Sequence, residues 1–328
     1  MKPPSLSYQP DDLLCGIDGG GTTSKVVVCT RDGVVVQAWH TGTINHYGAG
    51  TDTVRANFHA IAGRLVETCG CLPQHIFAGN SALSNRASRE MVDELTDGAF
   101  RGVHIHFHAD VYVALLGFTG GKPGAVLISG TGSMACGIDP AGNYHTAGGW
   151  GQVLGDEGSA YYIGLEGMKA ALHAYDGLAD ATRLTEQLKR FFHVADMSDI
   201  IAKVYHPPLE KRAIAAFATA VDEAARDGDR TAKQILERAG AWLYLLALAI
   251  CRRCQTTHLG YTGGVLIHNS VIRDEVRHRL QPHGIALQQP RFNPELGALI
   301  AAFLEAGIPL TDTILNNLLT YQREQQHE

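Results

Sequence analysis

The stretch that decides the fold is residues 15–30, which read CGIDGGGTTSKVVVCT. Asp18 stands just ahead of three consecutive glycines, and two threonines, a serine and a lysine follow them. Successive backbone N–H groups in such a loop form a concave nest that binds anions. Taken alone, the stretch is equally consistent with an ordinary glycine-rich hairpin, so the rest of the chain has to decide whether it binds phosphate.

Two familiar phosphate motifs fail on spacing. A P-loop requires G-x-x-x-x-G-K-[ST], and counted from Gly16 the lysine, Lys25, comes three residues too late. A dinucleotide fingerprint, G-x-G-x-x-G, would use Gly19 and Gly21 and then meets Ser24. Both motifs also open a helix, whereas the run after this loop is rich in β-branched side chains and predicts a strand. The loop is therefore expected to join two strands.

Composition and charge exclude several classes of protein. The chain has 328 residues, which is room for two domains, and a net charge of −6 without any block of lysines and arginines. These features argue against nucleic acid or an anionic membrane as a partner. The N-terminus lacks the pattern of a signal peptide, and the longest apolar run, residues 239–251, is shorter than the ~20 residues that span a bilayer. We expect a cytoplasmic protein in which this run is a buried helix.

The cysteines predict neither a disulfide framework nor a metal site. There are seven, an odd number, and they are scattered along the chain. Cys251-x-x-Cys254 has no second pair at the spacing of a zinc site, and Cys69-x-Cys71 does not supply one. We expect all seven to be packed or surface thiols.

The strand–loop–strand plan occurs a second time. Residues 125–138 read AVLISGTGSMACGI, in which an apolar run, a loop of glycines and hydroxyls at 130–133 and a second apolar run follow in order. A unit that is present once in each half of the chain predicts two related lobes. Two opposed loops of this kind would hold a polyphosphate between them.

A third glycine site follows later in the chain. Residues 260–276 read GYTGGVLIHNSVIRDEV, with a tight turn at Gly263 and Gly264. A helix is expected to begin after this turn, with Asn269 or Ser270 as its N-cap. The missing side chains of the two glycines would let a flat base approach the backbone, so this turn is a candidate nucleoside site.

Between the first two loops lies HIHFHADVYVALL, residues 104–116. The three alternating histidines share one face of a strand but lie in a line, ~7 Å apart, and do not converge on one metal ion. Asp110 follows this strand and precedes a helix expected over 111–118, the position where α/β sheets place functional groups. Capping that helix is the alternative role for Asp110.

The densest run of glycines is AGGWGQVLGDEGSAYYIG, residues 147–164, ahead of an amphipathic helix. So many glycines cost conformational entropy, and a purely structural loop rarely needs them. Asp156 would accept hydrogen bonds from a ligand rich in hydroxyls, with Trp150 shaping the pocket. A first-turn helix acid is the alternative interpretation of Asp156 and Glu157.

Taken together, GIDGGGTTSK, HAD, ISGTGS, GGWGQVLGDEGSAYYIG and TGGV resemble the N-acetylglucosamine kinase / benzoyl-CoA reductase ATPase family (the BadF/BadG/BcrA/BcrD type) of the actin–Hsp70–hexokinase superfamily. The resemblance covers about residues 12–300. It implies an α/β fold with two ribonuclease-H-like, actin-like ATPase lobes and an inter-lobe cleft for nucleotide and sugar. We place the N-terminal lobe at residues 10–118 and the C-terminal lobe at residues 119–328, with a C-terminal helix over 311–325 that can pack on the first lobe.

The resemblance implies an amino-sugar kinase that uses ATP and Mg²⁺. Asp110 would be the catalytic base toward the sugar 6-hydroxyl, and Asp18 would face the metal through water. The other implied contacts are to the ATP phosphates (Gly20, Gly21, Thr22, Thr23, Gly130, Thr131, Gly132, Ser133), to adenosine (Gly263, Gly264) and to the sugar (Asn45, Asp110, Gly149, Trp150, Gly151, Asp156).

Two other functions exist on the same fold. An ATPase activator of a radical dehydratase or reductase needs cysteines for an iron–sulfur cluster that bridges two subunits. Here Cys136 lies on the apolar run after the second loop, without a CGG-type companion. The complete stretch GGWGQVLGDEG at residues 148–158, which we call the sugar loop, favours the kinase. A sugar-sensing regulator would need a DNA-binding segment, and only about eleven residues precede the first expected strand.

The identity of the amino sugar stays open between N-acetylglucosamine, glucosamine and N-acetylmuramic acid. Residues 80–85, NSALSN, are candidates for the region near the C2 substituent, but no residue decides the matter. The resemblance also implies a homodimer.

Overall fold

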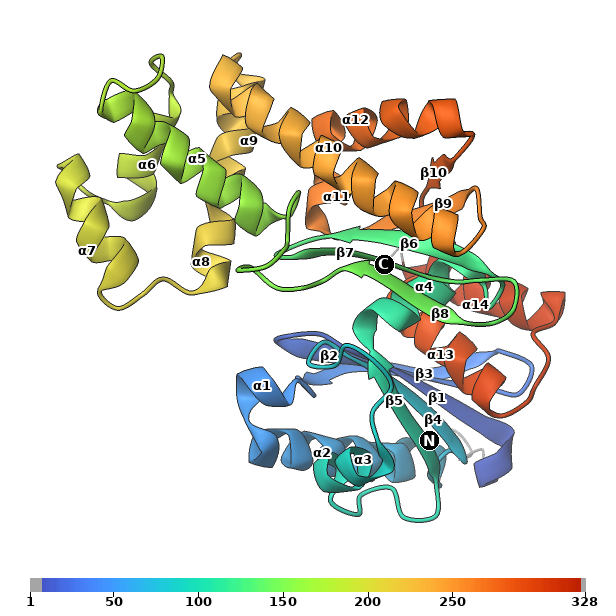
Figure 1. The fold of residues 1–328 in the computed structure, drawn as a ribbon. Coiled ribbons are helices and arrows are strands. Elements are labelled where there is room, and N and C mark those ends of the chain that lie inside the picture. Colours follow the sequence, from blue (N-terminus) through green and yellow to red (C-terminus); the bar gives the residue numbers. More distant parts are fainter. Residues whose placement is uncertain (1–7, 326–328) are drawn as a thin grey trace. The chain divides into compact units, whose positions relative to one another are not determined.

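The computed structural model describes residues 8–325, and the chain in that range forms two compact units (Figure 1). The first unit contains residues 8–122 and 290–325, and the second contains residues 123–289. Their five-stranded sheets have the orders β3-β2-β1-β4-β5 and β10-β9-β6-β7-β8. The strands of the second sheet therefore repeat the connectivity of the first, which confirms the expected duplicated α/β fold.

The first unit is built around the hairpin predicted from residues 15–30. Strands β1 and β2 pair antiparallel up to Gly19 opposite Ser24, while β4 and β5 continue the sheet parallel to β1. The elements of this unit are η1 Pro10–Asp12, β1 Leu13–Gly19, β2 Thr23–Thr30, β3 Val35–Gly42, α1 His46–Ala49, α2 Thr51–Cys69, β4 His75–Asn80, α3 Arg89–Thr96, β5 His104–Ala109, α4 Asp110–Thr119, α13 Pro294–Glu305 and α14 Asp312–Gln325.

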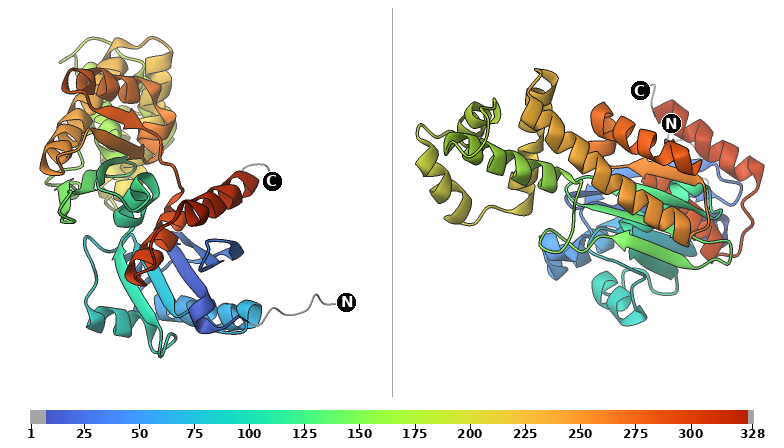
Figure 2. Two further views of the ribbon diagram at one scale, coloured as in Figure 1. Left: turned by 90° about the vertical axis from the view of Figure 1, so that its right-hand side faces the viewer. Right: turned by 45° about the horizontal axis from the view of Figure 1, so that its top comes forward.

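The two faces of the first sheet carry different partners. Leu13, Cys15 and Ile17 alternate along β1 and enter an apolar core with side chains of α2. On the other face α13 packs along β1 and also contacts α4 (Figure 2). Gly16 lies against α13. Residues two apart on a strand point to the same face, so Asp18 lies on the face of the sheet that α13 and α4 cover.

The second unit has the same central hairpin, made by β6 and β7, with β9 parallel to β6. Its elements are β6 Gly124–Ser129, β7 Ser133–Ile138, β8 Tyr144–Gly148, α5 Ala160–Tyr175, α6 Leu184–Phe192, η2 Met197–Asp199, α7 Ile200–Tyr205, α8 Lys211–Ala216, α9 Ala218–Arg226, α10 Arg230–Arg253, β9 His258–Thr262, α11 Gly264–His268, α12 Ser270–Leu280, η3 Gln281–His283 and β10 Ala286–Gln288.

The apolar run at 239–251 lies within α10, which packs against β6, β7 and α12 (Figure 1). Among the described residues this is the one helix that is long and apolar enough, by length and composition, to cross a membrane. Its buried positions recur every three to four residues from Ala232 to Cys251 and enter the apolar core of the second unit. The expected buried helix is confirmed.

The C-terminal part of the chain groups differently from the expected lobe 119–328. Residues from Pro290 onward cluster with the first unit, because α13 packs on β1, β4 and α4 of that unit. The helix expected over 311–325 is α14, which contacts β3, and Asn317 donates a hydrogen bond to the Asp32 carbonyl at 2.8 Å. The sequence of residues 290–325 gives no local signal that this segment packs on the first unit, because its contacts are with residues far away along the chain.

The cysteines form no disulfide within residues 8–325, where all seven lie. Burial raises the pKa of the Cys251 thiol to about 12 and that of Cys254 to about 11. Buried thiols of this kind are poor nucleophiles and poor metal ligands. In the same described range, no group of three or more histidine, cysteine or acidic side chains is arranged to hold a metal ion by itself.

Candidate active site

The first glycine loop connects β1 to β2. The backbone of the loop is anchored on one side, because the Thr43 hydroxyl donates to the Gly20 carbonyl at 2.7 Å. Beyond that anchor Gly21, Thr22 and Thr23 are exposed at the tip of the hairpin. The loop therefore presents backbone N–H groups and two hydroxyls at its surface, as an anion nest requires.

Asp18 lies at the end of β1, immediately before this loop. Burial, followed by the charges of Glu295 and Asp110, raises the pKa of its carboxyl to about 7, and Lys25 opposes the rise. Asp18 is thus close enough to Glu295 and to Asp110 for their charges to disfavour its own. Such a strongly perturbed group marks a candidate functional site.

Asp110 is the first residue of α4 and directly follows β5. In the parallel part of the sheet Asp18, Gly79 and His108 lie in one row, so Asp110 emerges two residues beyond the row that contains Asp18. Burial raises the pKa of the Asp110 carboxyl, although hydrogen bonds from the N–H groups of Asp110 and Val111 counteract this. Ala109 takes the N-cap position, without a side-chain cap, so Asp110 is not the cap of α4 but its first helical residue. Its charge is close enough to raise the pKa of Asp18.

Glu295 and Lys25 complete this cluster, and the sequence did not single out Glu295. The Lys25 ammonium donates to Glu295 Oε1 at 2.7 Å, and the glutamate is only 5% exposed. Burial lowers the pKa of Lys25, but the hydrogen bond and charge of Glu295 outweigh it, so the pKa is raised overall. Glu295 follows Pro294 in the first turn of α13, where an acid is ordinary. Its local sequence therefore gives no sign of its partner in β2.

Asn45 and the segment at residues 80–85 meet in the first unit. Asn45 caps α1, since its Oδ1 accepts from the Gly48 N–H at 3.0 Å, and its Nδ2 donates to Ser81 Oγ at 2.9 Å. The buried Asn80 amide donates to the Ile44 carbonyl at 2.9 Å. These contacts tie the two candidate sugar segments together, as a shared binding surface would require.

The second glycine loop connects β6 to β7 and rests on the start of α5. The Ala160 N–H donates to the Gly130 carbonyl at 2.9 Å, and the Tyr161 N–H donates to the Thr131 carbonyl at 3.3 Å. Ser133 is buried, and its hydroxyl donates to the Glu157 carbonyl at 2.7 Å. The exposed part of this loop is therefore Thr131, whereas Ser133 holds the loop in place.

Asp156 joins the sugar loop to the second glycine loop. It is 4% exposed and has a left-handed backbone, with φ 65°. Its Oδ1 accepts from the Ser133 N–H at 3.0 Å, and its Oδ2 accepts from the Lys211 ammonium at 2.5 Å. A non-glycine residue in this conformation is uncommon and persists where surrounding contacts over-determine the backbone, as the two hydrogen bonds of Asp156 do here. Asp156 lies before the start of α5, so it is not the first-turn acid that was the alternative.

Trp150 follows β8 in the same loop, between Gly149 and Gly151. Its side chain is 74% exposed, and those of Val153 and Leu154 are 86% and 77% exposed. Three large apolar side chains on one glycine-rich loop are unusual on a protein surface, and they are available to pack against a ligand.

The helix expected from Asn269 or Ser270 is present as α12, and the third glycine site begins a separate short helix, α11, that was not expected. Gly263 has φ 92° and precedes the short α11, and Asn269 then caps α12 by accepting from the Ile272 N–H at 2.9 Å. A side chain at Gly263 would meet the Ser129 carbonyl at 2.2 Å. The turn is therefore pressed against the end of β6, beside the second glycine loop.

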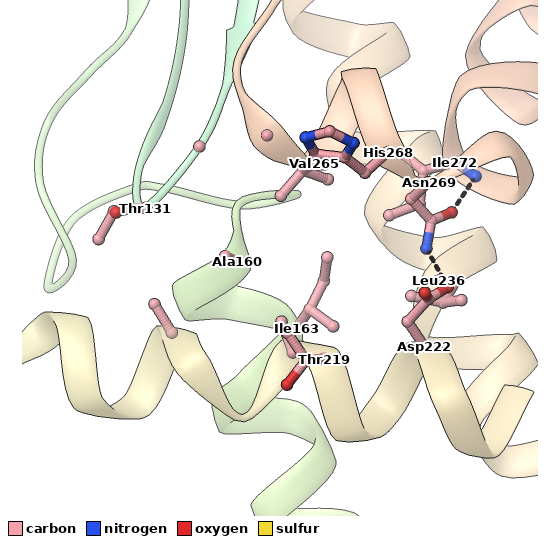
Figure 3. A pocket seen from close by; sticks show the side chains of 14 residues that line it. Thr131, Ala160, Ile163, Thr219, Asp222, Leu236, Val265, His268, Asn269 and Ile272 are labelled. Carbon is pink, nitrogen blue, oxygen red and sulfur yellow. Dashed lines mark hydrogen bonds between the residues drawn. The ribbon is translucent and has the colours of Figure 1, made fainter.

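A cavity of about 410 Å³ opens at this junction, inside the second unit (Figure 3). Its lining is mainly aliphatic, which suits the flat faces of a nucleobase. The residues around it are Gly130, Thr131, Ala160, Ile163, Ala215, Ala218, Thr219, Asp222, Leu236, Gly264, Val265, His268, Asn269 and Ile272. Gly130, Thr131 and Gly264, which the sequence assigned to phosphate and adenosine, thus share one cavity.

The two sheets and the carboxylate cluster define a ribonuclease-H-like, actin-type phosphotransferase architecture. The chain belongs to the BadF/BadG/BcrA/BcrD ATPase family, whose model matches residues 15–302. This match confirms the resemblance drawn from the motifs.

Three relatives with established names are similar to this chain in sequence. The chain is 28% identical over 275 residues to an N-acetylmuramic acid/N-acetylglucosamine kinase of Clostridium acetobutylicum, covering 80% of this chain and 89% of the relative. It is 26% identical to the N-acetyl-D-glucosamine kinase of Dictyostelium discoideum, with 89% and 98% covered. It is 27% identical to a glucosamine kinase of Vibrio cholerae, with 90% and 95% covered.

A solved structure of a candidate N-acetylglucosamine kinase from Chromobacterium violaceum shares the fold, with a TM-score of 0.70 and 25% identity. The comparison covers 89% of this chain and 99% of the other. A ROK family glucokinase from Streptomyces griseus, 15% identical with a TM-score of 0.51, shares the fold as well, with 89% and 98% covered.

Proposed function

We propose that the protein is an ATP-dependent amino-sugar kinase that transfers a phosphoryl group to the 6-hydroxyl of N-acetylglucosamine or glucosamine. The observation that carries the proposal is the placement of Asp110 directly after β5, two residues beyond the row that contains Asp18, with a pKa raised by burial. The names of the three relatives support the substrate class.

In this proposal Asp110 is the general base. A carboxylate with a raised pKa accepts the proton of the sugar 6-hydroxyl more readily than an exposed one, and a positioned base typically contributes ~10²–10⁴-fold in rate. The N–H groups of Asp110 and Val111 keep the carboxylate oriented while it does so. The rest of the acceleration in phosphoryl transfer comes from alignment and from stabilisation of charge.

The two glycine loops would hold the phosphates. Gly20, Gly21, Thr22 and Thr23 contribute from the first loop, and Gly130, Thr131 and Gly132 contribute from the second. Ser133 acts within the second loop by supporting its shape, since its N–H and hydroxyl donate to Asp156 and Glu157. Gly263 and Gly264 would approach the adenosine.

Asp18 fits the role of the residue that faces Mg²⁺ through water. Mg²⁺ in kinases keeps several waters and needs only one or two carboxylates besides the phosphates. The repulsion that Asp110 and Glu295 exert on the Asp18 carboxylate is one that a divalent cation would relieve. When bound, the ion would neutralise charge on the phosphates.

Asn45, Gly149, Trp150, Gly151 and Asp156 would bind the sugar. Asp156 would contribute mainly by holding the sugar loop in position, because both of its carboxylate oxygens already accept hydrogen bonds from Ser133 and Lys211. The cytoplasmic location and the homodimer that the family resemblance implies belong to the same proposal.

The activator alternative has less support. Its bridging cluster needs accessible thiolates, whereas Cys136 is fully buried within β7.

The test is a coupled assay of ADP release with N-acetylglucosamine, glucosamine, N-acetylmuramic acid or no sugar. We expect release to depend on an amino sugar and to fall by ~10²-fold or more in Asp110→Asn. Asp93→Asn is the matched control, because Asp93 is an exposed acid on α3 of the same unit. Sugar-independent hydrolysis that survives Asp110→Asn would overturn the kinase proposal.

A further inference from the structure

Lys211, the first residue of α8, places a positive charge beside the second glycine loop. A side-chain carbon added at Gly132 would lie 3.0 Å from the Lys211 Nζ, so the ammonium fills the space that a side chain at this position would need. The same ammonium donates to Asp156 Oδ2 at 2.5 Å. A loop whose backbone N–H groups can bind an anion thus has a cation directly beside it.

Lys211 lies on the helical face that lines the cavity of the second unit. Helices α8 and α9 meet at Phe217, whose own backbone is helical, with φ −67° and ψ −15°, so the two form an almost continuous helix. Lys211 precedes Ala215 by four residues, which is about one turn and roughly 6 Å along the axis. The cavity-lining residues of this helix recur with the helical period and are Ala215, Ala218, Thr219 and Asp222 (Figure 3).

The Lys211 ammonium can donate further hydrogen bonds. The lysine side chain is 31% exposed and that of Asp156 is 3% exposed, so the lysine is the member of the pair that a ligand can reach. An ammonium has three N–H donors, and within the described residues Asp156 takes one of them. Two donors are therefore available to the oxygens of an anion.

The cavity orders the parts of a nucleotide relative to Lys211. At one side of the cavity Asn269 Nδ2 donates to Asp222 Oδ1 at 2.7 Å, and Thr131 lies at the other side (Figure 3). The next residue of the loop, Gly132, and Lys211 lie just outside the lining. A nucleoside in the cavity would therefore place its first phosphate at Thr131, and any later phosphates would reach Gly132 and Lys211.

We propose that the Lys211 ammonium binds the phosphates of the nucleotide beyond the first one, while Asp156 holds the ammonium in place. The inference rests on the proposed function for the presence of a nucleotide in the cavity. It adds a cation to the second glycine loop, whose own glycines, threonine and serine offer only neutral donors. Hydrogen bonds from a charged donor to phosphate are roughly twice as strong as those between neutral groups.

Neutralising the buried Asp156 is the competing explanation for Lys211. In that case the lysine would act only on the shape of the second glycine loop, since Asp156 also accepts from the Ser133 N–H at 3.0 Å. A distorted loop would weaken every nucleotide, because Thr131 lines the cavity whatever the number of phosphates. A direct contact would weaken only nucleotides that carry a second phosphate. The ratio of the affinities for ADP and AMP therefore separates the two roles.

The experiment is calorimetric binding of ADP and AMP to the full chain, with EDTA to remove divalent cations and without sugar. The native protein should bind ADP ~10-fold or more tightly than AMP, which is the effect of one hydrogen bond from a charged group. In Lys211→Gln, whose amide can still donate to Asp156, the affinity for ADP should fall by about tenfold and that for AMP by less than about twofold. Lys211→Arg keeps the charge and should retain most of the native ADP:AMP ratio. Lys203→Met, a change at an exposed lysine on α7 of the same unit, should leave the ratio unchanged.

Equal affinities of the native protein for ADP and AMP would overturn the inference, and this measurement requires no variant to fold. Equal losses for ADP and AMP in Lys211→Gln would assign the lysine to the shape of the loop and would also overturn it. Because no sugar is present, these outcomes are independent of the assay for amino-sugar phosphorylation. A failed kinase assay together with an ADP:AMP ratio that depends on Lys211 would reject the proposed function and keep the inference.

Discussion

Lys25 and Glu295 form a salt bridge with 2.7 Å between Nζ and Oε1, although 270 positions separate them in the chain. The lysine side chain is 22% exposed and the glutamate side chain 7%. The pair fixes the start of α13 to β2, and β2 holds Lys25 directly opposite Asp18 in β1. The salt bridge therefore holds Glu295 in place next to Asp18.

Breaking this pair on one side is expected to destabilise the protein. Lys25→Met would leave the Glu295 charge buried without its partner, which costs about 3 kcal/mol in the free energy of unfolding. The double variant Lys25→Met with Glu295→Gln should recover a large part of the loss, since no buried charge remains. Urea unfolding measures both. Lys169→Met, which removes an exposed partner of Glu166, is the control and should change stability by less than about 1 kcal/mol; equal losses for the two lysines would contradict the argument.

Asp18 should make the protein less stable as the pH rises. Its folded pKa is about 7 against 3.8 for the ordinary group, so the folded state retains a proton that the unfolded state has released. Between about pH 4 and pH 7 the unfolded state therefore binds fewer protons, and stability falls as the pH rises. Asp18→Asn should be more stable than the native protein at pH 7.5, and the two should converge near pH 4. Unfolding curves across that range check this, and a constant difference at all pH values would count against it.

Alanine should be much more destabilising at Gly263 than at Gly264, the two glycines of the third site. Gly263→Ala forces a left-handed backbone and places a methyl 2.2 Å from the Ser129 carbonyl oxygen, so we expect a loss of at least about 2 kcal/mol and weaker nucleotide binding. In Gly264→Ala the nearest atom, His268 Cδ2, lies 3.9 Å from the added carbon. That variant should stay within about 1 kcal/mol of the native protein. Thermal unfolding with and without ADP compares them.

Asp156 should affect both substrates. Asp156→Asn weakens the contact with Lys211 and gives the Ser133 N–H a neutral acceptor, so the second glycine loop and the sugar loop lose their common anchor. We expect KM to rise by about tenfold for ATP and for the amino sugar alike, which corresponds to the loss of one charge-assisted hydrogen bond. A rise confined to the sugar would instead mark Asp156 as a direct sugar ligand. Initial rates at varied concentrations of each substrate separate the two outcomes.

Local chemistry was sufficient to predict much of the fold. The glycine–hydroxyl loops at 19–23 and 129–133 were recognised as hairpin turns because β-branched or apolar runs flank them, and both connect antiparallel strands. A cap at Asn269 or Ser270 was likewise visible in its own segment, and Asp110 was found because it directly follows a strand.

What could not be predicted depends on distant partners. Glu295 looks like an ordinary first-turn acid, and only the packing of α13 on β1 brings it to Lys25. Lys211, the partner of Asp156, lies in an unremarkable stretch 55 residues away. The pairing of Asp222 with Asn269 is hidden in the same way, because each side chain has a sufficient local reason to be polar.

The return of the chain to the first unit has a consequence for its synthesis. Helix α13 fits so closely that a side chain at Gly297 would lie 1.9 Å from the Val113 carbonyl oxygen, and one at Gly16 would lie 2.5 Å from the Leu299 nitrogen. The ribosome makes β1 first and α13 almost last, with the whole second unit between them. The face of β1 that α13 covers in the folded protein is therefore without this partner for most of translation. Incompletely folded chains expose apolar surface and are prone to aggregate, so this face is exposed to that risk until α13 is made. The second unit, whose strands and helices are contiguous, is able to fold earlier and becomes the first finished part of the nascent protein.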